Sequence, residues 1–182
     1  MPRLLLLRHA KAAAGSSGAP DFDRPLTAQG RRSATLVGEH IAKHRLEPDR
    51  ILCSASRRTR ETLAALLPHL SGDADIRIAR SLYEPTAGHY CDIIGRFGLT
   101  AQTLLLIGHN PGMQDTAEML IGLGNGELRE TAVTRFSTAA LAVIDFEETR
   151  WDEVAAHSGR IVAFFRPRDL ELVGGDGSGD DV

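Results

Sequence analysis

The sequence has little cysteine, no long apolar run and no large excess of one charge. Its 182 residues include two cysteines, Cys53 and Cys91, which form no CxxC pair and are too few for a disulfide framework. No apolar run approaches the roughly 20 residues that cross a bilayer. A net charge of -3 implies no general affinity for nucleic acid. We therefore expect no redox cysteine pair, no membrane contact and no nucleic-acid partner.

The composition that remains is typical of a globular domain, with 42% hydrophobic and 25% charged residues. The length suits one domain with a sizeable core, which we place at residues 1–173. Residues 174–182 are rich in glycine and aspartate and are expected to form a disordered acidic tail. One basic residue and four leucines at the start make a poor signal peptide, so we expect a cytoplasmic protein.

Short apolar runs alternate with amphipathic segments along most of the chain. The patterns predict strands over residues 3–7, 49–54, 74–79 and 102–109 and two later strands over 138–146 and 159–167 that pair as a hairpin-like return. Strands that alternate with helices predict an α/β three-layer sandwich. Its central sheet is mostly parallel, with helices on both faces.

The helices are predicted from their caps and apolar spacing. Thr27 suits the N-cap of a helix that runs to about Arg45, and Thr86 suits the N-cap of a helix over 87–97. A further helix over 56–70 should stop near Pro68. Asn110 suits an N-cap with Pro111 at the first helical position.

Polar and cationic side chains follow three of these strands at the point where each strand ends. The three groups are Arg8 with His9, then Ser54, Ser56, Arg57, Arg58 and Arg60, and finally His109 with Asn110. Ligands of open α/β sheets bind beyond the carboxyl ends of the strands, where parallel neighbours would bring these groups together. The sequence therefore predicts a site at this edge.

Arginine and histidine together are suited to phosphoryl chemistry. A guanidinium group matches two phosphoryl oxygens at once and stays charged. A neutral imidazole can accept the phosphoryl group as a nucleophile, and nearby arginines favour the neutral ring. Free N–H groups at the start of the helix after Asn110 could add to the anion pocket.

Each of these features also has a purely structural interpretation as a loop, a solvated helix face or a hydrogen-bonded histidine. Their coincidence at three strand ends favours a site. His40 and His44 have metal-binding spacing, but "HIAKH" lacks the glutamate of HExxH and an evident third ligand, so we expect no metal. "GLGNGE" follows a helix rather than a strand and is not a dinucleotide loop, and we expect no cofactor.

At these residues the chain resembles the histidine phosphatase superfamily, and within it the short SixA-like phosphohistidine phosphatase branch. The motifs are "LLRHAKA", "RPLTAQGRRSA", "CSASRRTRET", "LIGHNPG" and "GRIVAFFRPRDLE", which together extend over residues 3–172. Ala10, Ala55 and Glu61 depart from the usual motifs. The resemblance implies a phosphoglycerate mutase-like fold.

The resemblance also implies roles at the matching positions. His9 would be the phosphoryl-accepting nucleophile, and Arg8, Arg58 and His109 would form the phosphate pocket, with Ser54 and Asn110 as further substrate-binding residues. Larger relatives use a carboxylic acid after the middle strand, where Glu84 stands. The SixA-like branch often lacks one, so Glu84 is either the general acid or a loop residue. Asp21 and Asp23 are weaker candidates for the acid.

The predicted function is a metal-independent phosphatase that dephosphorylates phosphohistidine in proteins through a covalent intermediate on His9. One alternative is a phosphomonoesterase that acts on a small phosphorylated metabolite with the same residues. The other is a phosphate- or phosphoprotein-binding module without turnover, which would not need the nucleophile.

Overall fold

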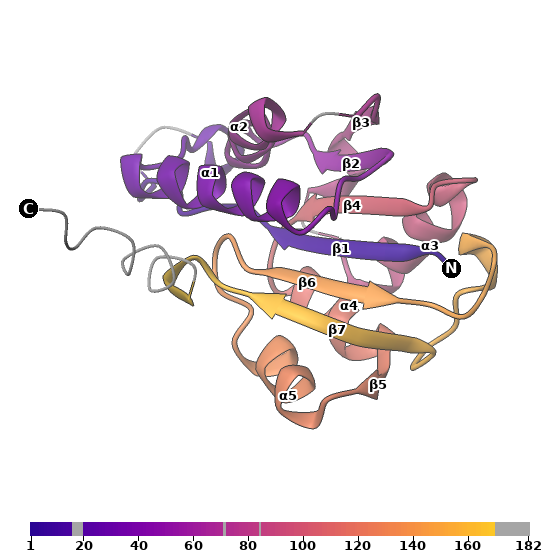
Figure 1. Cartoon of the computed structure of the whole chain (residues 1–182). Helices are drawn as coiled ribbons and strands as arrows, with labels where there is room; N and C mark the ends of the chain where they lie inside the picture. The colour runs from indigo at the N-terminus through magenta and orange to yellow at the C-terminus, as the bar shows by residue number, and fades with distance from the viewer. Residues whose placement is uncertain (16–19, 71, 84, 170–182) are drawn as a thin grey trace, which may run out of the picture.

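The computed structural model describes residues 1–15, 20–70, 72–83 and 85–169 (Figure 1). Its centre is a seven-stranded sheet in the order β3-β2-β4-β1-β6-β7-β5. The strands are β1 (Arg3–Arg8), β2 (Arg50–Ser54), β3 (Asp75–Ala79), β4 (Thr103–Gly108), β5 (Ile121–Gly124), β6 (Leu141–Asp145) and β7 (Gly159–Phe165).

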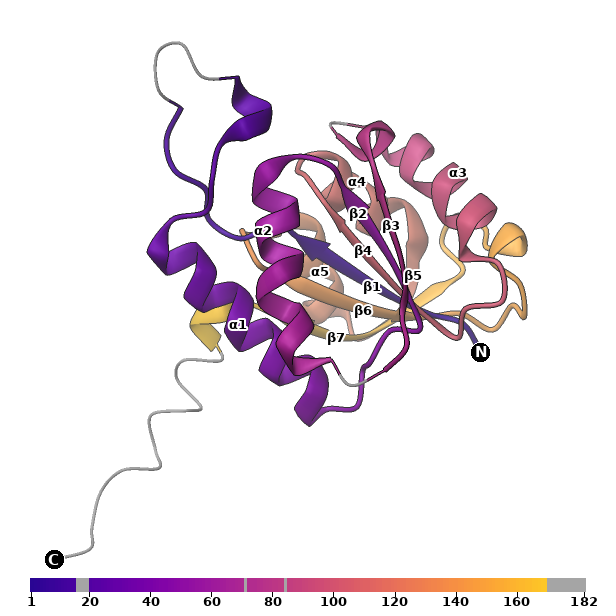
Figure 2. The ribbon, with the colours of Figure 1, turned by 90° about the horizontal axis from the view of Figure 1, so that it is seen from above.

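Helices cover both faces of the sheet, as Figures 1 and 2 show together. One face carries α1 (Ala28–Lys43) and α2 (Arg57–Leu66), and the other carries α3 (Ala87–Gly98), α4 (Gly112–Leu120) and α5 (Gly126–Thr134). Short 3-10 helices lie in the connections: η1 (Asp21–Asp23), η2 (Leu67–His69), η3 (Arg80–Leu82) and η4 (Trp151–Glu153). The predicted three-layer sandwich is confirmed.

Alternation along the central strands divides the core into two layers. Leu4 and Leu6 pack with α3, α4 and α5, whereas Leu5 and Leu7 pack with α1 and α2. All four leucines are completely buried. This explains the unbroken apolar run of β1, because a strand covered on both faces needs apolar side chains at every position.

The pairing of the central strands positions the candidate site. β4 is parallel to β1, with Leu7 opposite Ile107, and parallel to β2, with Cys53 opposite Ile107. The three strands therefore end at the same level of one edge. The sheet is mixed, because β6 pairs antiparallel with β1 and β7, as the predicted hairpin-like return requires.

The structure confirms two of the predicted helix caps and contradicts the third. The side chains of Thr27 and Thr86 accept hydrogen bonds from the N–H groups of Gly30 and His89 at the starts of α1 and α3. The prediction for Asn110 was wrong: α4 begins at Gly112 after Pro111, without a side-chain cap. The Asn110 amide instead donates to the carbonyl of Phe136.

Two elements, β5 and α5, were missed because their sequence is short and rich in glycine. Asn125 caps α5 by accepting from the N–H of Leu128, a signal that the sequence reading passed over. The expected tail at residues 174–182 and the boundary at residue 173 lie outside the described residues.

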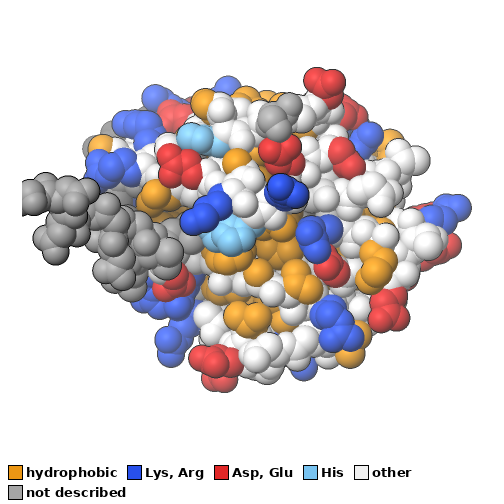
Figure 3. All heavy atoms as spheres, in the orientation of Figure 1, with side chains coloured by type: hydrophobic (Ala, Val, Ile, Leu, Met, Phe, Trp, Pro, Cys, Tyr) orange, Lys and Arg blue, Asp and Glu red, His pale blue; other side chains and the backbone are white. Residues whose placement is uncertain are grey.

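The surface carries both signs of charge. Lys and Arg are interspersed with Asp and Glu on the face seen in Figure 3, and hydrophobic side chains gather over β6 and β7, where no helix lies in front of the sheet. Within the part of the chain that the structure describes, no helix has the length and apolarity needed to cross a membrane.

The contact between α1 and the chain after β1 yields a stability prediction. A Cβ atom at Gly30 would lie 2.1 Å from the carbonyl oxygen of Lys11, which the Thr27 N–H and hydroxyl hold in place. Gly30→Ala should therefore lower the free energy of unfolding by about 2 kcal/mol or more. Gly88→Ala is the matched control, because nothing lies within 4 Å of its Cβ position early in α3. Urea unfolding measures both, and equal stability of the two variants would contradict this account.

Candidate active site

The His9 ring is held in one tautomer at the end of β1. Its Nδ1 atom lies 2.8 Å from the carbonyl oxygen of Ala10. A carbonyl oxygen can only accept, so Nδ1 carries the proton and donates it. The Nε2 atom therefore carries the lone pair. It accepts a 3.3 Å hydrogen bond from Nε of Arg58, so the unprotonated nitrogen faces the cationic group.

Arg58 lies in the first turn of α2, and its guanidinium group connects the pieces of the site. The residue is only 5% exposed. Its Nε atom donates to His9, Nη1 donates to the backbone carbonyl of Asp21 at 2.7 Å, and Nη2 lies 3.0 Å from the Asp21 carboxylate. These contacts use three of the five N–H groups, which leaves one on each terminal nitrogen.

Thr62, one turn further along α2, fixes the position of α2 against the end of β1. Its hydroxyl donates to the carbonyl of Arg58 at 2.7 Å and accepts from the N–H of Ala10 at 3.0 Å. The residue after the histidine is thus hydrogen-bonded to the helix turn that carries the arginine. This double contact explains how two segments 49 residues apart are held in register.

His109 lies beside His9, with a distance of 5.1 Å between the ring centroids. Its Nε2 atom is 2.8 Å from the hydroxyl of Ser54, and its backbone N–H donates to the buried hydroxyl of Tyr90 at 3.0 Å. The Nδ1 atom is buried without a partner within the described residues. Ser54, His9 and His109 follow or end three adjacent parallel strands, as predicted.

Burial and positive charge keep both rings neutral. Desolvation is the main cause that lowers the pKa of His9 from 6.5 to about 4, and the charges of Arg58 and Arg8 add to it. Desolvation also lowers the pKa of His109 to about 3, with smaller contributions from His9 and Arg58. A neutral imidazole is the form that can act as a nucleophile.

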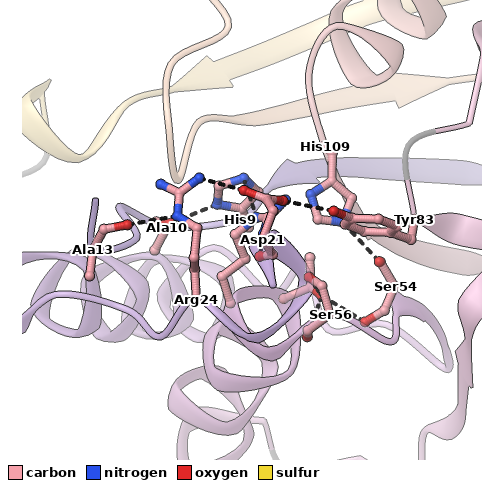
Figure 4. Close-up of polar contacts among 11 residues, drawn as sticks. His9, Ala10, Ala13, Asp21, Arg24, Ser54, Ser56, Tyr83 and His109 are labelled. Carbon is pink, nitrogen blue, oxygen red and sulfur yellow. Dashed lines mark hydrogen bonds and ion pairs between the residues drawn. The ribbon is translucent and has the colours of Figure 1, made fainter. Parts of the chain in front are cut away.

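Asp21 and Tyr83 also belong to the site, and Figure 4 shows them close to the two histidines. The Tyr83 hydroxyl donates to the Asp21 carboxylate at 2.7 Å, and the Tyr83 ring meets the edge of His109 at 5.4 Å. Hydrogen bonds from Arg24 and Tyr83 hold the pKa of Asp21 well below its usual range. Asp21 is therefore ionised and has no proton to donate near neutral pH.

Sequence reasoning ranked Asp21 as a weak acid candidate and missed Tyr83. The available signal was position: both residues lie in polar connections, as loop residues of α/β sites often do. Glu84, the other acid candidate, lies outside the described residues.

Arg8 and Asn110 meet in a neighbouring location. Arg8 Nη1 and Asn110 Nδ2 both donate to the carbonyl oxygen of Phe136, at 2.9 and 3.0 Å. No hydrogen bond joins either side chain to His9, Arg58 or His109 within the described residues. Arg8 still acts on the site through its charge, which lowers the pKa of both histidines.

The remaining polar candidates lie away from the two rings. Arg57 and Arg60 are exposed, and Arg57 pairs with Glu61 at 2.7 Å. Glu61, one of the departures from the family motif, accepts the N–H of Leu26 at 2.8 Å. His40 stacks on His44 and on Phe165. Among the described residues, no group of three or more His, Cys, Asp or Glu could hold a metal ion.

Comparisons with known proteins agree with this geometry. Residues 4–93 match the sequence model of the histidine phosphatase superfamily, branch 1. An uncharacterized protein of Mycobacterium tuberculosis is 34% identical over 164 residues, which are 89% of this chain and 100% of that protein.

Two solved structures are similar over nearly their whole length, and both carry the name phosphohistidine phosphatase SixA. The structure from Agrobacterium tumefaciens has a TM-score of 0.77 and 34% identity, and covers 92% of this chain and 99% of its own. The structure from Nakamurella multipartitia has a TM-score of 0.80 and 27% identity, and covers 91% of this chain and 96% of its own. The chain thus belongs to the histidine phosphatase superfamily, in its SixA-like group, and is a phosphatase.

Proposed function

We propose that this phosphatase removes the phosphoryl group from phosphohistidine in proteins, through a covalent intermediate on His9. The observation that carries the proposal is the tautomer of His9. Its Nδ1–H is bound to the Ala10 carbonyl, so Nε2 presents a lone pair beside Arg58 and His109. A binding module would need the arginine but not this nucleophile.

The first step exchanges one P–N bond for another. Nε2 of His9 gives up its 3.3 Å hydrogen bond from Arg58 and attacks phosphorus, the bond to the substrate imidazole breaks, and that imidazole leaves with a proton taken from solvent. Water then attacks the phosphoryl group, the bond to Nε2 breaks, and phosphate is released. The first step needs a neutral His9, which the lowered pKa of about 4 supplies at neutral pH, and in the second step Nε2 is the leaving nitrogen.

Charge on the transferring group is balanced by the arginine rather than by a metal. The two remaining N–H groups of Arg58, one on each terminal nitrogen, suit two phosphoryl oxygens. Ser54 and His109, whose side chains lie 2.8 Å apart, supply further polar contacts. Arg8 contributes positive charge, which lowers the pKa of His9. Positioning and electrostatics are the main sources of catalysis in phosphoryl transfer.

The acid chemistry favours phosphohistidine over an alkyl phosphate. An alkoxide needs a proton as it leaves, whereas an imidazole can be protonated beforehand. Asp21, the carboxylate bound to Arg58, is ionised because its pKa is lowered. The SixA name of the Agrobacterium tumefaciens protein, which is 34% identical, supports the same substrate class. Hydrolysis of a small phosphorylated metabolite, with Glu84 as the acid, is the alternative.

The test of this function combines a substrate panel with one variant. Wild-type protein should release phosphate fastest from a phosphohistidine protein, and more slowly from p-nitrophenyl phosphate and a sugar phosphate. His9→Ala should abolish release from all three without loss of helical circular dichroism. A trapped phosphoenzyme should be acid-labile and alkali-stable, as a P–N bond is. A variant that retained near wild-type activity would exclude the mechanism, and a preference for sugar phosphate would favour the alternative.

A second prediction concerns the geometry of Arg58. Arg58→Ala should lower kcat/KM by about 30- to 150-fold, equivalent to about 2–3 kcal/mol, because a buried charge-assisted contact is lost. Arg58→Lys should recover little of this, since lysine lacks the planar fork. Arg60→Ala is the control, because Arg60 is exposed on the same helix. Steady-state kinetics with p-nitrophenyl phosphate measure the effect of each substitution. An inactive Arg60→Ala variant together with an active Arg58→Ala variant would refute the role of Arg58 in binding the phosphoryl group.

A third prediction follows from the lowered pKa values. NMR should find His9 and His109 neutral at pH 6, with His9 titrating near 4, and His9→Asn assigns the resonances. As the pH is lowered through 6.5, the unfolded chain takes up these protons before the folded chain does. The contribution of the two histidines to the free energy of unfolding is therefore complete above pH 6.5. Below pH 6.5 the free energy of unfolding should decrease, by up to about 1.4 kcal/mol per pH unit for each histidine. Titration of His9 near 6.5 would contradict the lowered pKa of the nucleophile.

A further inference from the structure

A cavity of about 560 Å³ next to the active site is lined by four arginines, and we call it the arginine cavity. Its lining includes Arg8, Arg135, Arg166, Arg168, Asn110 and Ser137. Arg8 ends β1, Arg135 follows α5, and the other two arginines follow β7. Three segments that are distant in sequence thus bring cationic groups to one hollow.

The positive charge of the arginine cavity is only partly compensated. Asp169 pairs with Arg166 at 2.7 and 3.0 Å and lies 3.7 Å from Nε of Arg168. Arg135 is exposed and forms no ion pair with any acidic residue in the described ranges. Nε of Arg8 is buried without a hydrogen-bond partner among them. Four guanidinium groups therefore face one carboxylate, in a chain whose net charge is -3.

The arginine cavity shares Arg8 and Asn110 with the predicted site, but its lining does not include His9, Arg58 or His109. Arg8 directly precedes His9, and Asn110 directly follows His109, and both bind the Phe136 carbonyl on the cavity wall. His9 and Arg58 do not line the cavity. An anion in this cavity would thus lie beside the phosphoryl group and would not compete for its place.

We infer that the arginine cavity is a second anion-binding subsite, which takes Asp or Glu side chains flanking the phosphohistidine of a protein substrate. This inference rests on the proposed function and specifies the substrate further. The exposed Arg135 and Arg168, beside the half-buried Arg8 and Arg166, suit carboxylates on a protein surface, and complementary charge gives such contacts their specificity. An acidic neighbourhood would then distinguish substrates from other phosphohistidine proteins.

Kinetics with two peptides test the specificity. Arg135→Gln/Arg168→Gln should raise KM about five- to tenfold for a phosphohistidine peptide flanked by Asp and Glu. Its kcat should stay within about twofold, as should KM for a peptide with neutral flanks. Arg129→Gln is the matched control, because Arg129 is exposed on α5 and lies outside the cavity lining. An equal rise for both peptides, or none for the acidic one, would overturn the inference.

Ionic strength adds an independent readout. Contacts between exposed charges weaken as salt is added, so KM for the acidic peptide should rise with sodium chloride in the wild type. The double variant should show a flatter dependence. The same salt dependence in both proteins would mean that the two arginines do not contact the peptide.

Binding without turnover separates this inference from the proposed function. A fluorescent, unphosphorylated peptide of Asp and Glu should bind the wild type, bind the double variant about fivefold more weakly, and remain bound when inorganic phosphate fills the catalytic pocket. Displacement by phosphate, or equal binding by the two proteins, would overturn the subsite. Failure to hydrolyse phosphohistidine while the peptide still binds would instead overturn the proposed function.

The chain's own acidic residues are a competing occupant. Asp176, Asp180 and Asp181 follow Arg166 and Arg168 in the sequence. The full-length variant Asp176→Asn/Asp180→Asn/Asp181→Asn should bind the acidic peptide as the wild type does. Binding by this variant alone would assign the cavity to the chain's own end and exclude the partner.

Discussion

The parallel pairing of β4 with both β1 and β2 is the constraint on which the site depends. Because the leucines of β1 are buried on both faces, the apolar pattern alone does not specify its register. The charged residues at its ends do: Arg3 pairs with Asp145 at 2.6 Å, and Arg8 reaches the Phe136 carbonyl. With the strand anchored at both ends, His9 leaves the sheet level with the end of β4 and its histidine.

The contacts of Arg58 offset the cost of burying its positive charge. An unpaired buried charge costs several kcal/mol, and a neutral imidazole alone compensates little of that. The carboxylate and the carbonyl of Asp21 each accept from one terminal nitrogen of Arg58, and His9 accepts from Nε. The same carboxylate accepts hydrogen bonds from the side chains of Arg24 and Tyr83. These contacts hold the connection after β1 against the site. The loop thus completes the electrostatics of the site before a phosphoryl group arrives.

The sequence predicts the parts of this arrangement that depend on local pattern. Apolar runs predict β1 and β4, and the hydroxyls of Thr27 and Thr86 mark two helix starts because capping is a contact over three residues. The predicted N-cap at Asn110 is wrong because the Asn110 side-chain amide donates a hydrogen bond to the carbonyl of Phe136, which is distant in sequence. Asp21 and Tyr83 lie in connections whose sequence has no periodic apolar pattern. Their hydrogen bond could therefore not be predicted from the sequence.

The negative net charge of the chain does not reflect the local positive charge at the strand ends, which favours anions there. Acidic residues outnumber basic ones along the chain, yet around the nucleophile Asp21 and Asp169 each pair with two arginines. The guanidinium groups around the nucleophile serve two purposes. They favour anions near the strand ends, and they help hold the pKa of His9 at about 4, so the nucleophile is unprotonated. Attraction of a phosphoryl group and part of the lowered pKa of the nucleophile therefore come from the same charges, while burial of the His9 ring supplies the larger part of the shift.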